Sequence, residues 1–119
     1  MKKILVVDDD TRVLSALKRE LCKTFEVTTR SSGQAGLEAL DGIAPDIVLS
    51  DFKMAEMDGA WFLAEVQRRR PAAVRVLISA YADLTNAMES TPAGAISLFL
   101  CKPWSADLGD VLQRLLVTP

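Results

Sequence analysis

Short hydrophobic runs recur along the chain and predict five β-strands. The runs cover residues 4–7, 25–29, 47–49, 74–78 and 96–100. Each is too short for a helix and is followed by a more polar segment. The first, third and fourth runs are nearly continuous in Val, Ile and Leu, which is typical of strands covered on both faces of a sheet. We therefore expect a sheet that lies between two layers of helices.

The segments between these runs repeat their hydrophobic residues with the period of a helix. Within 13–21, four apolar residues share one helical face, and 62–66 and 108–115 show similar spacing. Pro92 and Gly94 mark the end of a short fourth helix. Strands that alternate with helices in so short a chain predict a parallel α/β sheet with right-handed crossovers.

Size and charge fit one compact domain over residues 1–119. Half of the residues are apolar, and the net charge is −2. Bulk charge therefore predicts neither direct nucleic-acid binding nor an anionic-membrane surface. The N-terminus lacks the pattern of a signal peptide, and no apolar stretch approaches the length of a membrane span. We expect a cytoplasmic protein.

The cysteines and the absence of histidine restrict the chemistry. Cys22 and Cys101 lie far apart without C-x-x-C spacing, and their apolar settings predict buried, reduced thiols. The chain contains no histidine. This excludes Ser-His-Asp and Cys-His catalysis, imidazole metal sites and phosphohistidine carriers. Any chemistry must therefore use carboxylates, hydroxyls or lysine.

Polar side chains follow four of the predicted strands, where the active groups of open parallel sheets collect. These residues are Asp8, Asp9 and Asp10 after the first strand, Asp51 after the third, Ser79 after the fourth, and Lys102 with Pro103 after the fifth. Asp10 and residues 30–32 also fit ordinary helix capping. Clustered carboxylates repel one another unless a cation lies among them, and an all-oxygen cluster suits Mg²⁺ or Mn²⁺.

These groups together suggest phosphoryl transfer to a carboxylate. A carboxylate can attack phosphorus and carry the group as an aspartyl phosphate. The transferring group spreads negative charge over its oxygens, which the metal, Lys102 and Ser79 with a backbone N–H could bind. Asp51 is the best nucleophile because it stands alone at a strand end. The adjacent Asp8 and Asp9 are better placed to hold a metal.

The motifs resemble those of receiver domains of two-component response regulators over essentially the whole chain. The matching segments are ILVVDDD (4–10), PDIVLSD (45–51), M-x-x-M-D-G (54–59), VLISA (76–80) and FLCKPW (99–104). The resemblance implies a doubly wound, flavodoxin-like five-stranded parallel sheet in the order 2-1-3-4-5. It also implies that Asp51 accepts a phosphoryl group from the phosphohistidine of a sensor histidine kinase or histidine phosphotransfer protein.

The resemblance also implies how a metal ion is held. Asp9 and Asp51 would ligate Mg²⁺ directly, and Asp8 would do so through water. The backbone carbonyl of Lys53 would add a further ligand.

Other residues would bind the phosphoryl group and change the surface. Ser79, the backbone N–H of Ala80 and Lys102 would bind phosphoryl oxygens. Phe99 would turn inward as Ser79 moves toward the phosphoryl group. The Lys102–Pro103 peptide would be cis, which is otherwise uncommon.

The surface formed by the fourth helix, fifth strand and fifth helix would then control an output domain or a partner protein. A homodimer is left open. Such a domain is not an enzyme beyond catalysing its own phosphorylation and dephosphorylation. The K-P-W ending resembles a subgroup whose members often begin larger signalling proteins, including cyclic-nucleotide phosphodiesterases and sensor kinases.

Several positions depart from the family pattern or bear on its rates. Ala55 replaces the usual proline, so the loop after Asp51 is expected to be less rigid. Phe99 replaces the commoner tyrosine. Lys53 and Tyr81 are large and lie where the family controls water access, which predicts slow to moderate self-hydrolysis. Trp61 is expected to be partly exposed.

Three other functions compete with that of a phosphorylatable receiver. A phosphatase of the haloacid dehalogenase type would use Asp8 as nucleophile, but Arg12 occupies the place of its Thr or Val. A degenerate receiver would serve only for docking or dimerisation, against which the complete set of charged site residues argues. A flavin or nucleotide binder would need a Gly-rich phosphate loop, which the chain lacks.

Overall fold

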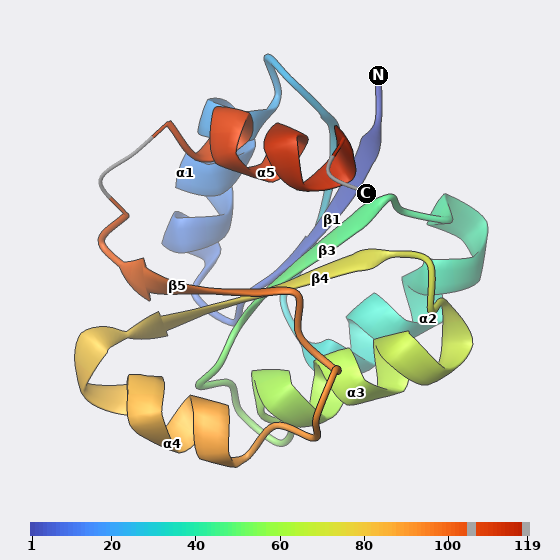
Figure 1. Cartoon of the computed structure of the whole chain (residues 1–119). Helices are drawn as coiled ribbons and strands as arrows, with labels where there is room; N and C mark the ends of the chain where they lie inside the picture. The colour runs from blue at the N-terminus through green and yellow to red at the C-terminus, as the bar shows by residue number, and fades with distance from the viewer. Residues whose placement is uncertain (105–106, 118–119) are drawn as a thin grey trace.

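The computed structural model is a five-stranded parallel sheet with helices on both faces (Figure 1). It describes residues 1–104 and 107–117. The sheet order is β2-β1-β3-β4-β5, which confirms the predicted fold class. The strands are β1 (Lys3–Val7), β2 (Glu26–Arg30), β3 (Ile47–Asp51), β4 (Val74–Ala80) and β5 (Leu98–Lys102). The helices are α1 (Thr11–Leu21), α2 (Gly33–Ile43), α3 (Gly59–Arg69), α4 (Leu84–Glu89) and α5 (Leu108–Val117), and a 3₁₀ turn (Tyr81–Asp83) precedes α4.

The sheet separates two hydrophobic cores. Successive side chains of a strand point to opposite faces. In β1, Ile4 and Val6 pack with residues of α1 and α5, whereas Leu5 and Val7 pack with residues of α2 and α3. Figure 1 shows α1 and α5 above the sheet and α2, α3 and α4 below it. Because both faces of β1, β3 and β4 are covered, these strands are apolar at most positions, and their polar residues lie mainly toward the ends.

The parallel register brings the carboxyl ends of the strands to one edge. Val7 of β1 lies opposite Ser50 of β3, and Ala80 of β4 lies opposite Lys102 of β5. The loops that follow β1, β3, β4 and β5 therefore start side by side, and these loops carry most of the predicted site residues.

Side-chain caps fix the beginnings of three helices. Asp10 accepts the backbone N–H of Arg12 at the start of α1, and Ser32 accepts that of Ala35 at the start of α2. Both capping predictions are confirmed. Asp58 caps α3 in the same way. A cap satisfies a helix N–H that has no partner within the helix, so each short loop ends in a defined place.

Three details of the sequence interpretation were wrong. Cys22 is exposed, because it follows the last residue of α1 and the helical period buries Leu21 instead. Cys101 is half-buried, and both thiols are free. The predicted second strand also began too early: Phe25 is buried but lies in the turn before β2, with its N–H bonded to Leu21.

The outer strand β5 was likewise predicted two residues too early, since it begins at Leu98 and includes Lys102. Ile96 belongs instead to the segment before the strand, where it packs against the α2–α3 core.

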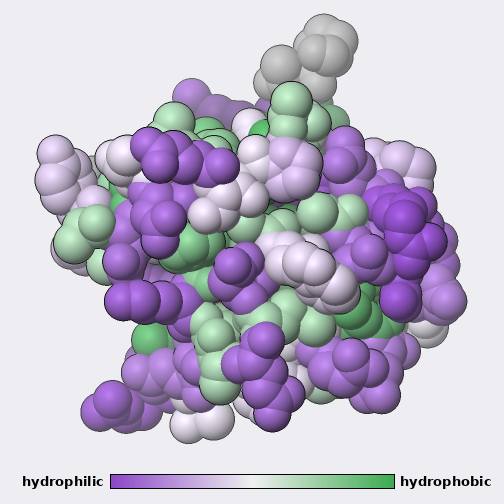
Figure 2. Space-filling model, turned by 90° about the horizontal axis from the view of Figure 1, so that it is seen from below, coloured by the Kyte–Doolittle hydropathy of each residue, from purple (hydrophilic) through white to green (hydrophobic). Residues whose placement is uncertain are grey.

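The surface beneath the sheet is mixed in character. Figure 2, which views the molecule from below, shows hydrophobic residues in small groups separated by hydrophilic ones. Within residues 1–104 and 107–117, no helix has the length and hydrophobicity needed to cross a membrane.

Candidate functional site

Three carboxylates meet at the edge where β1 and β3 end. Asp8, Asp9 and Asp51 each offer an oxygen atom, and these oxygens lie within 4.8 Å of one another. The side chain of Asp8 is 3% exposed and that of Asp51 is 12% exposed, whereas Asp9 is exposed. The sequence placed all three at this edge, and the structure brings them together. An oxygen-only cluster of this charge has the chemistry that Mg²⁺ prefers.

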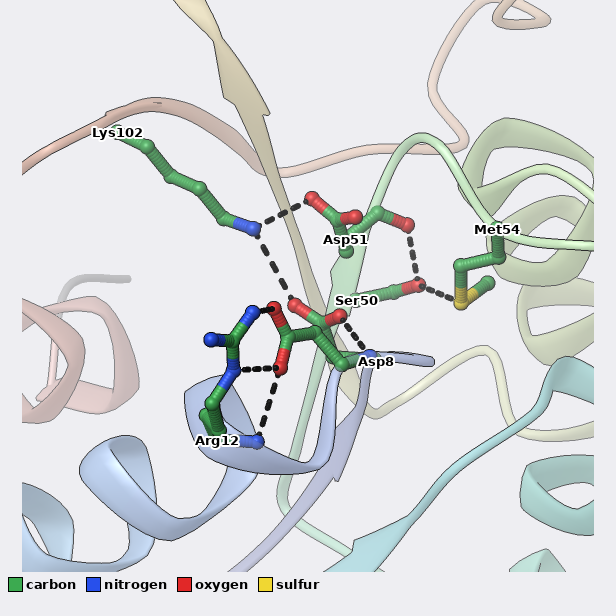
Figure 3. Close-up of polar contacts among 7 residues, drawn as sticks. Asp8, Arg12, Ser50, Asp51, Met54 and Lys102 are labelled. Atoms are coloured by element: carbon green, nitrogen blue, oxygen red, sulfur yellow. Dashed lines mark hydrogen bonds and ion pairs between the residues drawn. The ribbon is translucent and has the colours of Figure 1, made fainter.

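Lys102, at the end of β5, forms ion pairs with two of the three carboxylates. Its Nζ lies 3.0 Å from Asp51 Oδ1 and 3.2 Å from Asp8 Oδ2 (Figure 3). One ammonium therefore faces three carboxylates, which leaves the group with excess negative charge. This imbalance, at a partly buried site, favours an additional cation.

The pKa values reflect burial and charge together. Burial raises the pKa of Asp51, and the charges of Asp8 and Asp9 add to this effect, which outweighs the contact with Lys102. Burial alone would lower the pKa of Lys102. The hydrogen bonds and charges of Asp51 and Asp8 overcome that effect and raise the pKa. Lys102 therefore stays protonated, ready to pair with incoming negative charge.

Backbone amides orient the two aspartates that follow β1. Asp8 Oδ1 accepts the N–H of Asp10 at 2.9 Å, which turns the chain toward α1. Asp9 Oδ2 accepts the N–H of Ala55 at 3.0 Å. The sequence analysis noted Ala55 only as a replacement for proline and did not predict this bond, because every residue except proline carries a backbone N–H.

Ser79 supplies an unused hydroxyl near the carboxyl end of β4, one residue beyond Ile78, which lies opposite Asp51 in the sheet. It is 2% exposed, and its Oγ has no hydrogen-bond partner among the described residues. Buried polar atoms are nearly always hydrogen-bonded, so an unpartnered hydroxyl at such a site is a candidate ligand-binding group. Ser79 pairs with Cys101 and Leu77 pairs with Phe99 across β4 and β5. Because of this register, the side chains of Ser79 and Phe99 share one face of the sheet.

The remaining predicted residues line the rim. Ala80 ends β4 directly after Ser79, and the Lys102–Pro103 peptide bond is cis, in agreement with the resemblance. Lys53 is exposed just after β3, and its Nζ lies 3.7 Å from Asp83 Oδ1 across the mouth of the site. Such an exposed ion pair contributes little stability. Its backbone carbonyl as a metal ligand stays a prediction.

Ser50, which the sequence analysis did not single out, and Gly59 of the M-x-x-M-D-G motif shape the loop after Asp51. Ser50 Oγ donates a hydrogen bond to the Asp51 carbonyl oxygen at 2.9 Å and lies 4.0 Å from Met54 Sδ (Figure 3). A side chain at Gly59 would collide with that same carbonyl. The M-D-G motif contained the signal for Gly59, since a glycine at a helix start often permits close backbone approach.

Comparison with known proteins agrees with this geometry. The chain is 36% identical over 104 residues to the hydrogenase transcriptional regulatory protein HoxA of Cupriavidus necator, covering 87% of this chain and 22% of that protein. It is 36% identical over 117 residues to the transcriptional regulatory protein GlrR of Escherichia coli, covering 93% and 26% respectively. The chain thus spans about a quarter of the length of these relatives.

A solved structure titled adenylate cyclase, from Rhodopirellula baltica, superposes with a TM-score of 0.87 at 32% identity, covering 98% of this chain and 87% of that one. Residues 4–114 match the family described as the response regulator receiver domain. With the sheet order, the acidic cluster and the facing lysine all in place, the chain belongs to the response regulator receiver domain family.

Proposed function

We propose that Asp51 of this chain accepts a phosphoryl group with the help of Mg²⁺. Phosphorylation and Mg²⁺ binding are general features of the family. The observation that carries the assignment to this residue is the contact of the acidic cluster with Lys102, whose Nζ lies 3.0 Å from Asp51. The unpartnered hydroxyl of Ser79, on the neighbouring strand, supports it. The chain would act as a signalling domain, and its chemistry would be limited to its own phosphorylation and dephosphorylation.

The transfer step uses one oxygen of Asp51. Oδ1 contacts Lys102, while Oδ2 accepts no hydrogen bond within the described part of the chain. A carboxylate oxygen attacks phosphorus as the P–N bond of a donor phosphohistidine breaks, and the bonding electrons remain on the imidazole. Lys102, Ser79 and the backbone N–H of Ala80 would bind the transferred oxygens.

Asp8, Asp9 and Asp51, with the backbone carbonyl of Lys53, would hold the metal. When bound, it would offset the negative charge that the carboxylates and the phosphoryl group bring together. The residues fit such an ion, because their donors are all oxygen and their charge exceeds that of the single facing ammonium.

Phosphorylation would then change the surface of α4, β5 and α5. A phosphoryl group adds roughly −1.5 to −2 charges and three acceptor oxygens. Ser79 gains a partner by moving toward it, and Phe99, on the same sheet face, turns inward behind it. The altered surface would control an output domain or partner protein, and the donor would be a cytoplasmic histidine kinase or phosphotransfer protein. We propose that residues 1–119 act as one receiver domain, in the K-P-W subgroup.

The test is intact mass after incubation with Mg²⁺ and acetyl phosphate. A single, hydrolysable phosphoryl adduct is expected on the wild-type chain and not on Asp51→Asn. An adduct that persists in Asp51→Asn would identify a different acceptor. Absence of both an adduct and Mg²⁺ binding would instead favour a degenerate receiver that only docks to partners.

A further inference from the structure

Asp9 is bonded differently from the other carboxylates of the cluster. Lys102 contacts Asp8 and Asp51, whereas Asp9 Oδ2 accepts the N–H of Ala55, which lies 46 positions further along the chain. Among the residues that the structure describes, no basic side chain pairs with Asp9. The orientation of this exposed carboxylate therefore depends on the loop between β3 and α3.

Ala55 itself lies in a strained turn. Its carbonyl oxygen accepts the N–H of Met57 at 2.8 Å, and the intervening Glu56 has a φ of 70°. A bond between residues two apart around a positive φ is typical of a γ-turn, which is rarely adopted by residues that carry a side chain. Strained backbone of this kind persists only where surrounding contacts hold it. The bond from Ala55 to Asp9 is one such contact.

The loop is closed firmly at its base. Gly59 donates its N–H to the carbonyl oxygen of Phe52 at 2.7 Å, and Phe52 donates its own N–H to Ile78 at 2.9 Å. Residues 53–58 thus form a short loop whose two ends are held by these hydrogen bonds. The hydrogen bond from Ala55 to Asp9 connects this loop to the segment between β1 and α1. A proline at position 55 has no N–H and could not form this tie.

We propose that Ala55 is a positioning residue for Asp9 and couples the β3–α3 loop to metal binding. This inference rests on the metal site of the proposed function. A carboxylate has two oxygens, so Asp9 can keep Oδ2 on Ala55 while Oδ1 remains for the cluster. A hydrogen-bond donor that fixes the orientation of a metal-binding side chain strengthens metal binding. By reciprocity, metal binding at Asp9 orders the loop.

Amide hydrogen exchange measured by NMR on the metal-free protein tests the bond. Asp9→Ala and Asp9→Asn both remove the negative charge, but Asp9→Asn keeps an acceptor oxygen. We expect the Ala55 amide to exchange about tenfold faster in Asp9→Ala than in Asp9→Asn, as for the loss of one hydrogen bond. Equal rates would overturn the proposal. Asp9 is exposed, so both variants should fold, and matching amide spectra elsewhere would verify this.

Adding Mg²⁺ to the wild-type protein tests the coupling. Saturation, followed through the Asp51 amide shift, should slow exchange at Ala55 by at least threefold. Faster exchange would mean that the metal withdraws Asp9 from Ala55, and unchanged exchange would mean that site and loop are independent; either overturns the coupling. No Mg²⁺ binding at all would refute the metal site as well, which the unchanged Asp51 shift would reveal.

Discussion

Arg75 is a buried cation that is held by backbone carbonyls, and replacing it should loosen the segment before β5. It lies on β4 and is 8% exposed. Its guanidinium donates hydrogen bonds to the carbonyl oxygens of Ala73 and Ala95, both at 2.7 Å, and of Pro71 and Gly94, at 3.1 and 3.3 Å. Burial lowers the pKa of Arg75. These bonds join the α3–β4 turn to the α4–β5 loop.

The substitution Arg75→Met keeps an apolar stem and removes the donors. The bonds to Ala73 and Ala95 are buried, and each orphaned acceptor costs about 1–3 kcal/mol. Relief from burying a cation offsets part of this cost. We expect a net loss of about 2–4 kcal/mol, against a total of about 6–18 kcal/mol for a domain of this length.

Urea unfolding followed by circular dichroism measures this loss. The matched control is Arg68→Met, since Arg68 is a 67% exposed residue paired with Glu65 on α3, and its loss should stay within about 0.5 kcal/mol. Arg75→Lys keeps the positive charge but loses the planar guanidinium with its several N–H donors. Its loss of unfolding free energy should lie between those of the other two variants. A loss below about 0.5 kcal/mol in Arg75→Met would refute the role of the carbonyl contacts.

Three further substitutions test the site. Because burial raises the pKa of Asp51 in the folded protein above that of an unfolded aspartate, the free energy of unfolding should fall as the pH rises from the unfolded pKa through the folded pKa. Asp51→Asn should remove this fall and raise the melting temperature at pH 7, and superimposable stability curves would contradict the charge argument. Gly59→Ala should destabilise the domain by about 1–3 kcal/mol in thermal unfolding, because its Cβ meets the Asp51 carbonyl and lies 2.7 Å from Leu77; unchanged stability would show that the loop yields easily. Ser79→Ala should leave stability nearly unchanged yet slow adduct formation with acetyl phosphate by about 10- to 100-fold, and equal rates would remove Ser79 from the site.

The central strands were predictable because their burial is imposed on both faces. β1, β3 and β4 need apolar residues at most positions, and this leaves a continuous signal in the sequence. The outer strands β2 and β5 are only partly buried, so their limits are less sharply marked, and the neighbouring apolar residues Phe25 and Ile96 look like strand in the sequence although they lie just outside it. Cys22 was misjudged for a different reason. It follows Leu21 directly, and a shift of one residue at the end of a helix moves a side chain from the core to the solvent.

The candidate site was predictable because of strand direction. In a parallel sheet all carboxyl ends reach one edge, so the residues after each strand meet whatever the details of the loops. The strand order alone is enough to bring Asp8, Asp51 and Lys102 close together. Their ion pairs follow from charge and proximity.

The sequence by itself determined the sheet, its covered central strands and the set of charged groups at its edge, since these depend on periodicity and strand direction. Only the tertiary structure decided which group each one contacts. The bond from Ala55 to Asp9 and the carbonyl contacts of Arg75 join loops that are far apart in sequence. Such contacts use backbone atoms, which every residue except proline presents alike as donor and acceptor, and they form only where the fold brings the loops within hydrogen-bonding distance.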